Sequence, residues 1–292
     1  MSATEPALPT LDDVLAAPLR VGEPDVHGPL AVFPLFGAPP VLDYVAFADG
    51  CARGVVVKEL ADGASVNDLV VLKPVSCVEH GRWDGARHDE AFSPAPQAAY
   101  PSLRRMKNAT AHARVAAGLE ARAEQGAVWA EVAAKSDRHD VASDTGAMHD
   151  IYERRRDALR GFAAAVSLHD GQTGALAAIG GRLEVLDHVS RPDAFATLHR
   201  PLVQGYALEA DPAAAPPSLD AARAFVARLG RARTTEHDGI GAGRDLRLAD
   251  RGVTGAGLVA GNEVVQLTAF AGDDGDARPA PRARIRRPSR RR

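Results

Sequence analysis

The stretch GALAAIGGRLEVLDHV, from Gly174 to Val189, decides the fold class. Two apolar runs flank Gly180 and Gly181, and glycine readily adopts the positive φ angles that a tight primed turn requires. The stretch therefore predicts two strands joined by a hairpin. Because a hairpin pairs its strands antiparallel, it favours an antiparallel or mixed sheet over a regular βαβ alternation.

The residues after this hairpin predict two helices and then a closing antiparallel meander. Apolar spacing predicts the helices from Pro192 to about Leu208 and from Leu219 to Leu229. Three strand-like segments follow a glycine-rich loop, RDLRLAD, TGAGLVAG and NEVVQLTAF. The order of elements is typical of an α+β fold, with a cluster of helices on one mixed or antiparallel sheet.

The residues before the hairpin predict strands first and helices second. LAVFPLF (Leu30–Phe36) is an apolar strand, and Pro34 confines it to a sheet edge or a bulge, because proline donates no hydrogen bond to a neighbouring strand. The pattern also predicts a short helix over 42–49 and two strands, over 54–60 and 65–79. Three helices follow: one over 102–119, one over 123–136, and one that begins around 143–145 and ends at about 168.

We expect one main domain with unlike ends. Residues 1–25 are proline-rich and predict a flexible leader, residues 26–272 an α+β domain, and residues 273–292 a disordered arginine-rich tail. Residues 277–292 contain eight arginines and no acid, so the other 276 residues carry a net charge of −11, against −3 for the whole chain. The tail predicts non-specific, salt-sensitive contact with nucleic acid, because it has no aromatic residue on which a base would stack.

Cysteine usage and hydropathy predict a cytoplasmic protein. Cys51 and Cys77 are too few for a disulfide framework, and we expect both thiols to be reduced. The first twenty residues lack the pattern of a signal peptide, and no apolar run approaches the roughly 18 residues of a membrane span. We therefore expect no membrane contact.

The segment KPVSCVEHGRW (Lys73–Trp83) holds the candidate catalytic residues Cys77, Glu79 and Arg82. In a strand, Cys77 and Glu79 lie on the same face, where the carboxylate opposes thiolate formation unless a cation such as Arg82 offsets it. The alternative is structural: a buried cysteine, an ion pair between Glu79 and Arg82, and Trp83 as an anchor. The sequence leaves open whether the protein is an enzyme.

Other motifs give no cofactor or metal site. The set of Cys77, Glu79, His80, Asp84 and His88 matches no zinc or iron spacing. Five histidines directly precede an aspartate, but adjacent residues of a strand face opposite ways and form no catalytic dyad. GIGAGRD (Gly239–Asp245) lacks both the GxGxxG spacing and the lysine of a phosphate loop.

Several segments together resemble a bacterial family, the ARG and Rhodanese-Phosphatase-superfamily-associated protein domain, formerly a domain of unknown function. They are, in order, GPLAVFPLFG, GVVVKE, PVSCVEHGRW, QGAVWAEV, DTGAM and HRPLVQGYALEAD. The resemblance covers roughly residues 28–270. It implies an association with ADP-ribosylglycohydrolases and rhodanese-phosphatases, and so a role near ADP-ribose, NAD or nucleotide processing.

The chain departs from the family pattern just before the cysteine segment. In the family, the strand equivalent to Asp68–Val71 is followed by a segment with a Gly-Glu pair and a Lys-Gln-Asn-Arg run. Here VVLKPVSCVE is continuous. The resemblance therefore implies a member of altered or lost activity that binds a small anionic ligand or a protein partner. The alternative is an enzyme that acts on an anionic ADP-ribose-like or nucleic-acid substrate through Cys77, Glu79 and Arg82.

Overall fold

The computed structural model describes residues 8–53, 78, 95–119, 121, 123–210, 215–239 and 243–272, and the fold is given for these residues. The helices are α1 (Leu11–Val14), α2 (Phe47–Ala52), α3 (Pro101–Ala116), α4 (Gln125–Arg138), α5 (Met148–Arg154), α6 (Arg156–Ala165), α7 (Pro192–Ala207) and α8 (Leu219–Gly230). The strands are β1 (Arg20–Val21), β2 (Asp25–His27), β3 (Leu30–Phe36), β4 (Gly174–Ile179), β5 (Arg182–Val189), β6 (Thr234–Asp238), β7 (Arg244–Asp250), β8 (Val253–Ala260) and β9 (Glu263–Ala271).

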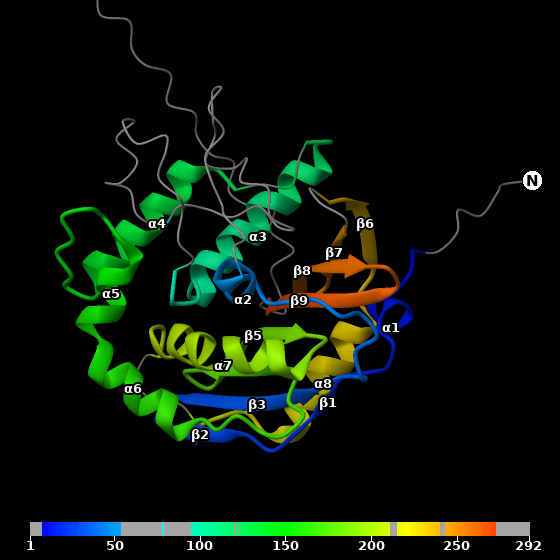
Figure 1. Cartoon of the computed structure of the whole chain (residues 1–292), viewed down its shortest axis with the longest axis horizontal. Helices are drawn as coiled ribbons and strands as arrows, with labels where there is room; N and C mark the ends of the chain where they lie inside the picture. Colours follow the sequence, from blue (N-terminus) through cyan, green and yellow to red (C-terminus); the bar gives the residue numbers. More distant parts are fainter. Residues whose placement is uncertain are drawn as a thin grey trace, which may run out of the picture.

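Across the described residues, nine strands form one antiparallel sheet (Figure 1). The strand order is β1-β3-β4-β5-β9-β8-β7-β6, and β2 pairs with residues 30–32 of β3. The first strands and the closing meander therefore join through the pairing of β5 with β9. The predicted α+β class with an antiparallel sheet is confirmed.

The hairpin that decides the fold has the predicted turn. Gly180 and Gly181 join β4 to β5 with φ angles of 57° and 81°, the left-handed region that glycine reaches without a steric penalty. At the start of β4, a Cβ on Gly174 would lie 2.5 Å from the Asp187 carbonyl oxygen. The two strands therefore approach more closely there than any residue with a side chain allows.

Alternation along the strands divides the apolar residues between two cores. Val185 of β5 and Phe270 of β9 face a core shared with α3 to α7. Leu186 and Leu267 face the opposite core, which α1 and α8 cover. Figure 1 shows α4, α5 and α6 following one another along one side of the molecule, with α7 lying across the sheet. The sheet is thus covered on both faces, by unequal helical layers.

The helices largely follow the predicted pattern, with two differences in extent. Residues 143–168 form α5 and α6 rather than one helix, because the chain turns at Arg155. α5 begins only at Met148, later than the predicted start at 143 to 145, and its N-cap residue, Ala147, makes no side-chain cap. The Ala147 N–H itself donates to the Ser143 hydroxyl at 2.9 Å. The short helix predicted over 42–49 begins only at Phe47 and extends to Ala52.

Of the two positions predicted for Pro34, a sheet edge is wrong, because β3 lies between β4 and the pair β1 and β2. A bulge agrees with the structure, because the pairing register shifts by one residue across Pro34, from Val21–Leu35 to Asp25–Val32. β2 pairs with residues 30–32 and β1 with residues 35–36, so Pro34 lies between these two ladders. Its carbonyl oxygen still accepts a hydrogen bond from Gly22 N at 2.9 Å. A proline is tolerated here because no neighbouring strand needs its missing N–H.

The first residues are more structured than their composition suggests. The segment predicted as a flexible leader contains α1 and β1, and β2 begins at its last residue. The Leu11 N–H donates to the Ala232 carbonyl at 3.0 Å, and the Thr234 N–H donates to the Pro9 carbonyl at 2.8 Å. Residues 9–11 are thereby attached to residues 232–234, where the chain passes from α8 into β6. The sequence pattern did not predict β6. The predicted strands over 54–60 and 65–79 lie outside the described residues, apart from Val78.

Candidate functional site

The candidate catalytic residues Cys77, Glu79 and Arg82 lie outside the described residues. Val78, between the first two, is described. Its carbonyl oxygen accepts a hydrogen bond from the Met148 N–H at 2.8 Å, at the start of α5, and its side chain packs against the helix-side core. The family-specific segment therefore touches the helical layer at this residue.

Polar residues form a buried network at the centre of the sheet. Asp187 of β5 is 6% exposed, and its Oδ1 accepts hydrogen bonds from Arg104 of α3 at 2.5 Å and from Thr268 of β9 at 2.8 Å. Its Oδ2 accepts one from the Tyr206 hydroxyl of α7 at 2.7 Å. The network thus joins two helices to two adjacent strands through one carboxylate.

The cationic side of this network retains free donors. Burial opposes the charged form of Arg104, but the Asp187 charge outweighs it and raises the pKa of the guanidinium. Arg104 Nε and one terminal nitrogen are buried without a hydrogen-bond partner, as is the Asn108 amide oxygen one turn later. Burial also lowers the pKa of Lys107, on the same helix, to about 8. α3 therefore contributes to this network one buried guanidinium, which is paired with Asp187.

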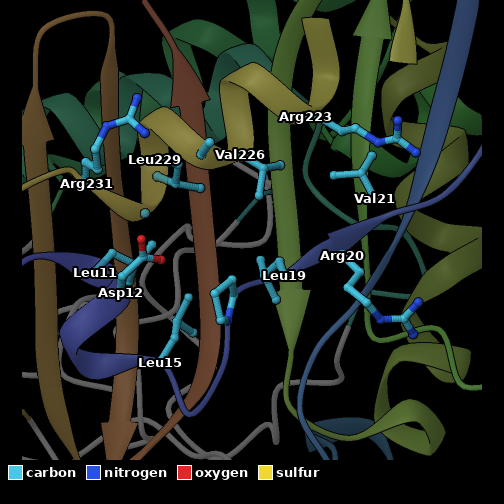
Figure 2. Close-up of a pocket in the computed structure, with 13 residues that line it drawn as sticks. Leu11, Asp12, Leu15, Leu19, Arg20, Val21, Arg223, Val226, Leu229 and Arg231 are labelled. Atoms are coloured by element: carbon cyan, nitrogen blue, oxygen red, sulfur yellow. The ribbon is translucent and has the colours of Figure 1, made fainter. Parts of the chain in front are cut away.

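An open cleft with a volume of about 590 Å³ lies between the first residues of the described chain and α8. Figure 2 shows its apolar wall, to which Leu19, Val226 and Leu229 contribute. Leu11 and Leu15 add to this wall from α1 and the residue after it. The volume lies within the range of small-molecule sites, and such sites are mostly apolar with a few polar groups at their rims.

Three arginines line the rim of this cleft. Figure 2 draws Arg20 and Arg223 toward one end and Arg231 at the other, together with Asp12. All three arginines are exposed, and Arg20 lies over the Phe36 ring, with its guanidinium carbon 5.2 Å from the ring centroid. We call this site the arginine cleft. Its charge and shape suit a ligand that carries a negative group and an apolar or planar part.

Neither of these sites was predicted from the sequence. Arg20 falls in a segment without strand or helix periodicity, while Arg223 lies on a helix more than two hundred residues later. Asp187 carried a usable signal, since a carboxylate within an otherwise apolar strand requires a partner when it is buried. That partner is Arg104. The sequence does not identify it, because the helix that carries Arg104 was predicted from its general pattern alone.

The described residues contain neither a metal-ligating cluster nor a helix that could span a membrane. No group of three or more histidine, cysteine, aspartate or glutamate side chains there is arranged to hold a metal ion. No helix of that part of the chain is long and apolar enough to cross a bilayer. Cys51, in α2, is a free thiol.

Comparison with known proteins gives one match. No curated protein and no solved structure matches the chain. A model of the ARG and Rhodanese-Phosphatase-superfamily-associated Protein domain matches residues 18–73 and 72–270. The two parts meet where the chain lacks the polar segment that the resemblance led us to expect, and a missing segment would produce such a break. Since the match spans most of the chain, the protein belongs to the ARG and Rhodanese-Phosphatase-superfamily-associated Protein domain family.

Proposed function

We propose that the protein is a ligand-binding module, without strong catalytic activity, for an anionic ligand of the ADP-ribose or nucleotide class. The observation that carries the proposal is the arginine cleft, where Arg20, Arg223 and Arg231 surround an apolar wall. The family's association with ADP-ribosylglycohydrolases agrees with a ligand of this class.

The physical match is between phosphate groups and guanidinium groups. Arginine presents N–H donors in a planar fork that fits two phosphate oxygens at once, and such bonds are about twice as strong as neutral hydrogen bonds. Arg20 and Arg223 come from different elements, β1 and α8, so a diphosphate between them would be held from two sides. The apolar wall then accommodates the less polar part of the ligand.

The cleft itself lacks the groups of a covalent catalyst. Its lining residues include no cysteine, serine, threonine or histidine. Asp12 is its one carboxylate. A single exposed carboxylate without a paired acid or base is a poor catalyst for hydrolysis. Binding without turnover is therefore the function that the cleft supports best.

Isothermal titration calorimetry with ADP-ribose, AMP and pyrophosphate tests the proposal directly. We expect Arg20→Gln and Arg223→Gln each to weaken ADP-ribose binding by roughly 10- to 100-fold, the loss typical of one hydrogen bond to a charged group. Arg160→Gln is the matched control, since Arg160 is exposed on α6 and does not line the cleft. If all three ligands fail to bind, or if both cleft variants bind as tightly as the control, the proposal is wrong.

The competing enzyme hypothesis uses Cys77, Glu79 and Arg82 and has its own test. It predicts turnover of NAD or an ADP-ribose conjugate by the purified protein, and loss of that turnover in Cys77→Ala. It also predicts a low thiol pKa, so that iodoacetamide modifies Cys77 well below pH 8. Such turnover, lost in this variant, would replace the binding proposal.

A further inference from the structure

Asp12 is the carboxylate that lines the arginine cleft, and it lies at the end opposite Arg20 and Arg223 (Figure 2). Its neighbour Asp13 has a structural role, because Asp13 Oδ2 accepts hydrogen bonds from the Thr10 backbone N–H and from the Thr10 hydroxyl, each at 2.8 Å. Asp12 makes no hydrogen bond or ion pair with any other residue that the structure describes. The two carboxylates of α1 therefore differ in role, and the capping of the helix does not account for Asp12.

The position of the Asp12 carboxylate disfavours the end of α8 in two ways. A Cβ on Gly230, the last residue of α8, would lie 2.5 Å from Asp12 Oδ2 and closer still to Oδ1, so the carboxylate occupies the space of a side chain. Gly230 has no positive φ angle, so its backbone does not require glycine, and alanine is the better helix former. The C-terminal end of a helix also carries partial negative charge, which repels a carboxylate. Local features that oppose stability in this way are expected at functional sites.

The two ends of the cleft are too far apart for a small anion to reach both. Arg223 and Gly230 are seven residues apart on α8, which corresponds to about 10 Å at 1.5 Å per residue. Figure 2 draws the Arg223 side chain extending away from Asp12, and the wall between them is apolar. A diphosphate held by the arginines therefore does not reach Asp12, whereas a nucleotide, in which a sugar follows the phosphates, is long enough.

The arginine end of the cleft is the end that suits the phosphates. Arg223 has one weak internal partner, since its Nη1 atom lies 3.5 Å from Asp220 Oδ1 and both side chains are exposed. Arg20 lies over the Phe36 ring and makes no ion pair with another described residue. Most of the positive charge at this end is thus available to an anion.

Charges of both signs lie at the opposite end. Arg231 lines the cleft beside Asp12, and no ion pair joins the two side chains. The carboxylate repels a second phosphate there, and the guanidinium repels an ammonium group. A neutral group with several hydroxyls suits both, because a carboxylate only accepts hydrogen bonds and a guanidinium only donates them. A ribose is such a group, and an acidic side chain that accepts from a ribose hydroxyl recurs in dinucleotide-binding folds.

We propose that Asp12 binds the 2′ and 3′ hydroxyl groups of a ribose, so that the arginine cleft selects ribonucleotides over 2′-deoxyribonucleotides. This role rests on the ligand class proposed above and adds the group that discriminates within it. Arg20 and Arg223 hold the phosphates, and the sugar lies over the apolar wall with its hydroxyls donating to the carboxylate. The absence of a side chain at Gly230 leaves the carboxylate the space that it occupies.

The experiment is titration calorimetry with ADP, 2′-deoxy-ADP and pyrophosphate. ADP has a single ribose, directly beside the diphosphate, so its comparison with 2′-deoxy-ADP isolates one hydroxyl. We expect the wild-type protein to bind ADP roughly tenfold more tightly than 2′-deoxy-ADP, the loss typical of a hydrogen bond to a charged group. Asp12→Ala should abolish this preference without weakening pyrophosphate binding, because it removes a negative charge from the cleft. Asp137→Ala, at an exposed carboxylate of α4 outside the cleft, should keep the preference.

A second variant displaces the carboxylate without removing its charge. Gly230→Ala places a methyl group where the Asp12 carboxylate lies, and it should reduce the preference for ADP while circular dichroism shows an intact fold. Equal binding of ADP and 2′-deoxy-ADP by the wild-type protein, or a preference that persists in Asp12→Ala, would refute the role of Asp12. If Arg20→Gln weakens pyrophosphate binding but the ribose preference is absent, only this role is wrong. If none of the three ligands binds, the proposed ligand class is wrong as well.

Discussion

Replacing His188 with phenylalanine should make the protein markedly less sensitive to acid. The folded protein holds this imidazole neutral, with a pKa of about 4, while the unfolded chain protonates it near its usual value of about 6.5. Below that value the unfolded state takes up a proton that the folded state refuses, so unfolding becomes easier as the pH falls. The loss begins near pH 6.5 and is complete near pH 4.

The magnitude follows from the difference between the two pKa values. Each pH unit between them changes the free energy of unfolding by about 1.4 kcal/mol, so lowering the pH from 7 to 5 costs about 2 kcal/mol through His188 alone. His112, His139 and His199 also have lowered pKa values, and they add to the acid sensitivity of both proteins. Only the difference between the two proteins reports on His188.

The assay is urea unfolding of the wild-type protein and His188→Phe at pH 7, 6 and 5. The gap between their free energies of unfolding should shift by about 2 kcal/mol in favour of the variant between pH 7 and 5. Parallel pH profiles would refute the argument, since they would mean that His188 gains or loses its proton equally in both states. A variant that is unstable at every pH still reports the shift, because the prediction concerns the slope.

Three further predictions concern stability and the tail. Asp187→Ala should lower the free energy of unfolding by roughly 3–5 kcal/mol because it leaves a buried cation unpaired, whereas Tyr206→Phe should cost only about 1 kcal/mol; equal losses in urea unfolding would contradict this. Gly255→Ala places a Cβ 2.5 Å from a backbone oxygen and should cost about 1–3 kcal/mol. Gly126→Ala, in open space on α4, should instead gain about 0.5–1 kcal/mol, and a thermal melt in which both shift the same way would count against the packing argument. Deleting 277–292 should remove retention on heparin, and unchanged retention would exclude the tail as a nucleic-acid contact.

The sequence predicted the fold best where local chemistry leaves one choice. Gly180 and Gly181 require a turn, and the meander alternates clearly, so the antiparallel sheet followed from the pattern. Of the two positions expected for Pro34, the sheet edge failed because β3 has neighbours on both sides, while the bulge agrees with the one-residue shift in register at Pro34. In the structure two short strands share one side of β3, and the gap between them tolerates proline. The proline is the one local signal of such a gap.

The sites were harder to predict because distant residues build them. Asp187 and Thr268 lie on strands separated by two helices and three strands of sequence, and only the pairing of β5 with β9 brings them together. The segment LDHVS reads as a strand, and its alternation sends Asp187 and His188 to opposite faces. The alternation does not indicate which partner each of these polar side chains contacts. Cys77 was a candidate because its neighbours in sequence are polar. Polar neighbours in sequence are weaker evidence for a site than contacts between side chains in the folded protein.

The attachment of residues 9–11 to residues 232–234 has a practical consequence for handling the protein. One wall of the arginine cleft comes from the start of the chain and the other from α8, and these backbone hydrogen bonds, together with the burial of Leu11 and Leu19 against α8, hold the two walls together. Proteolytic trimming of the first twenty residues would remove one wall, including Leu11, Leu15 and Leu19. A bulky fusion partner placed immediately before Pro9 would strain the same junction. Affinity tags are therefore better placed at the other terminus, and ligand screens belong with an untrimmed N-terminus.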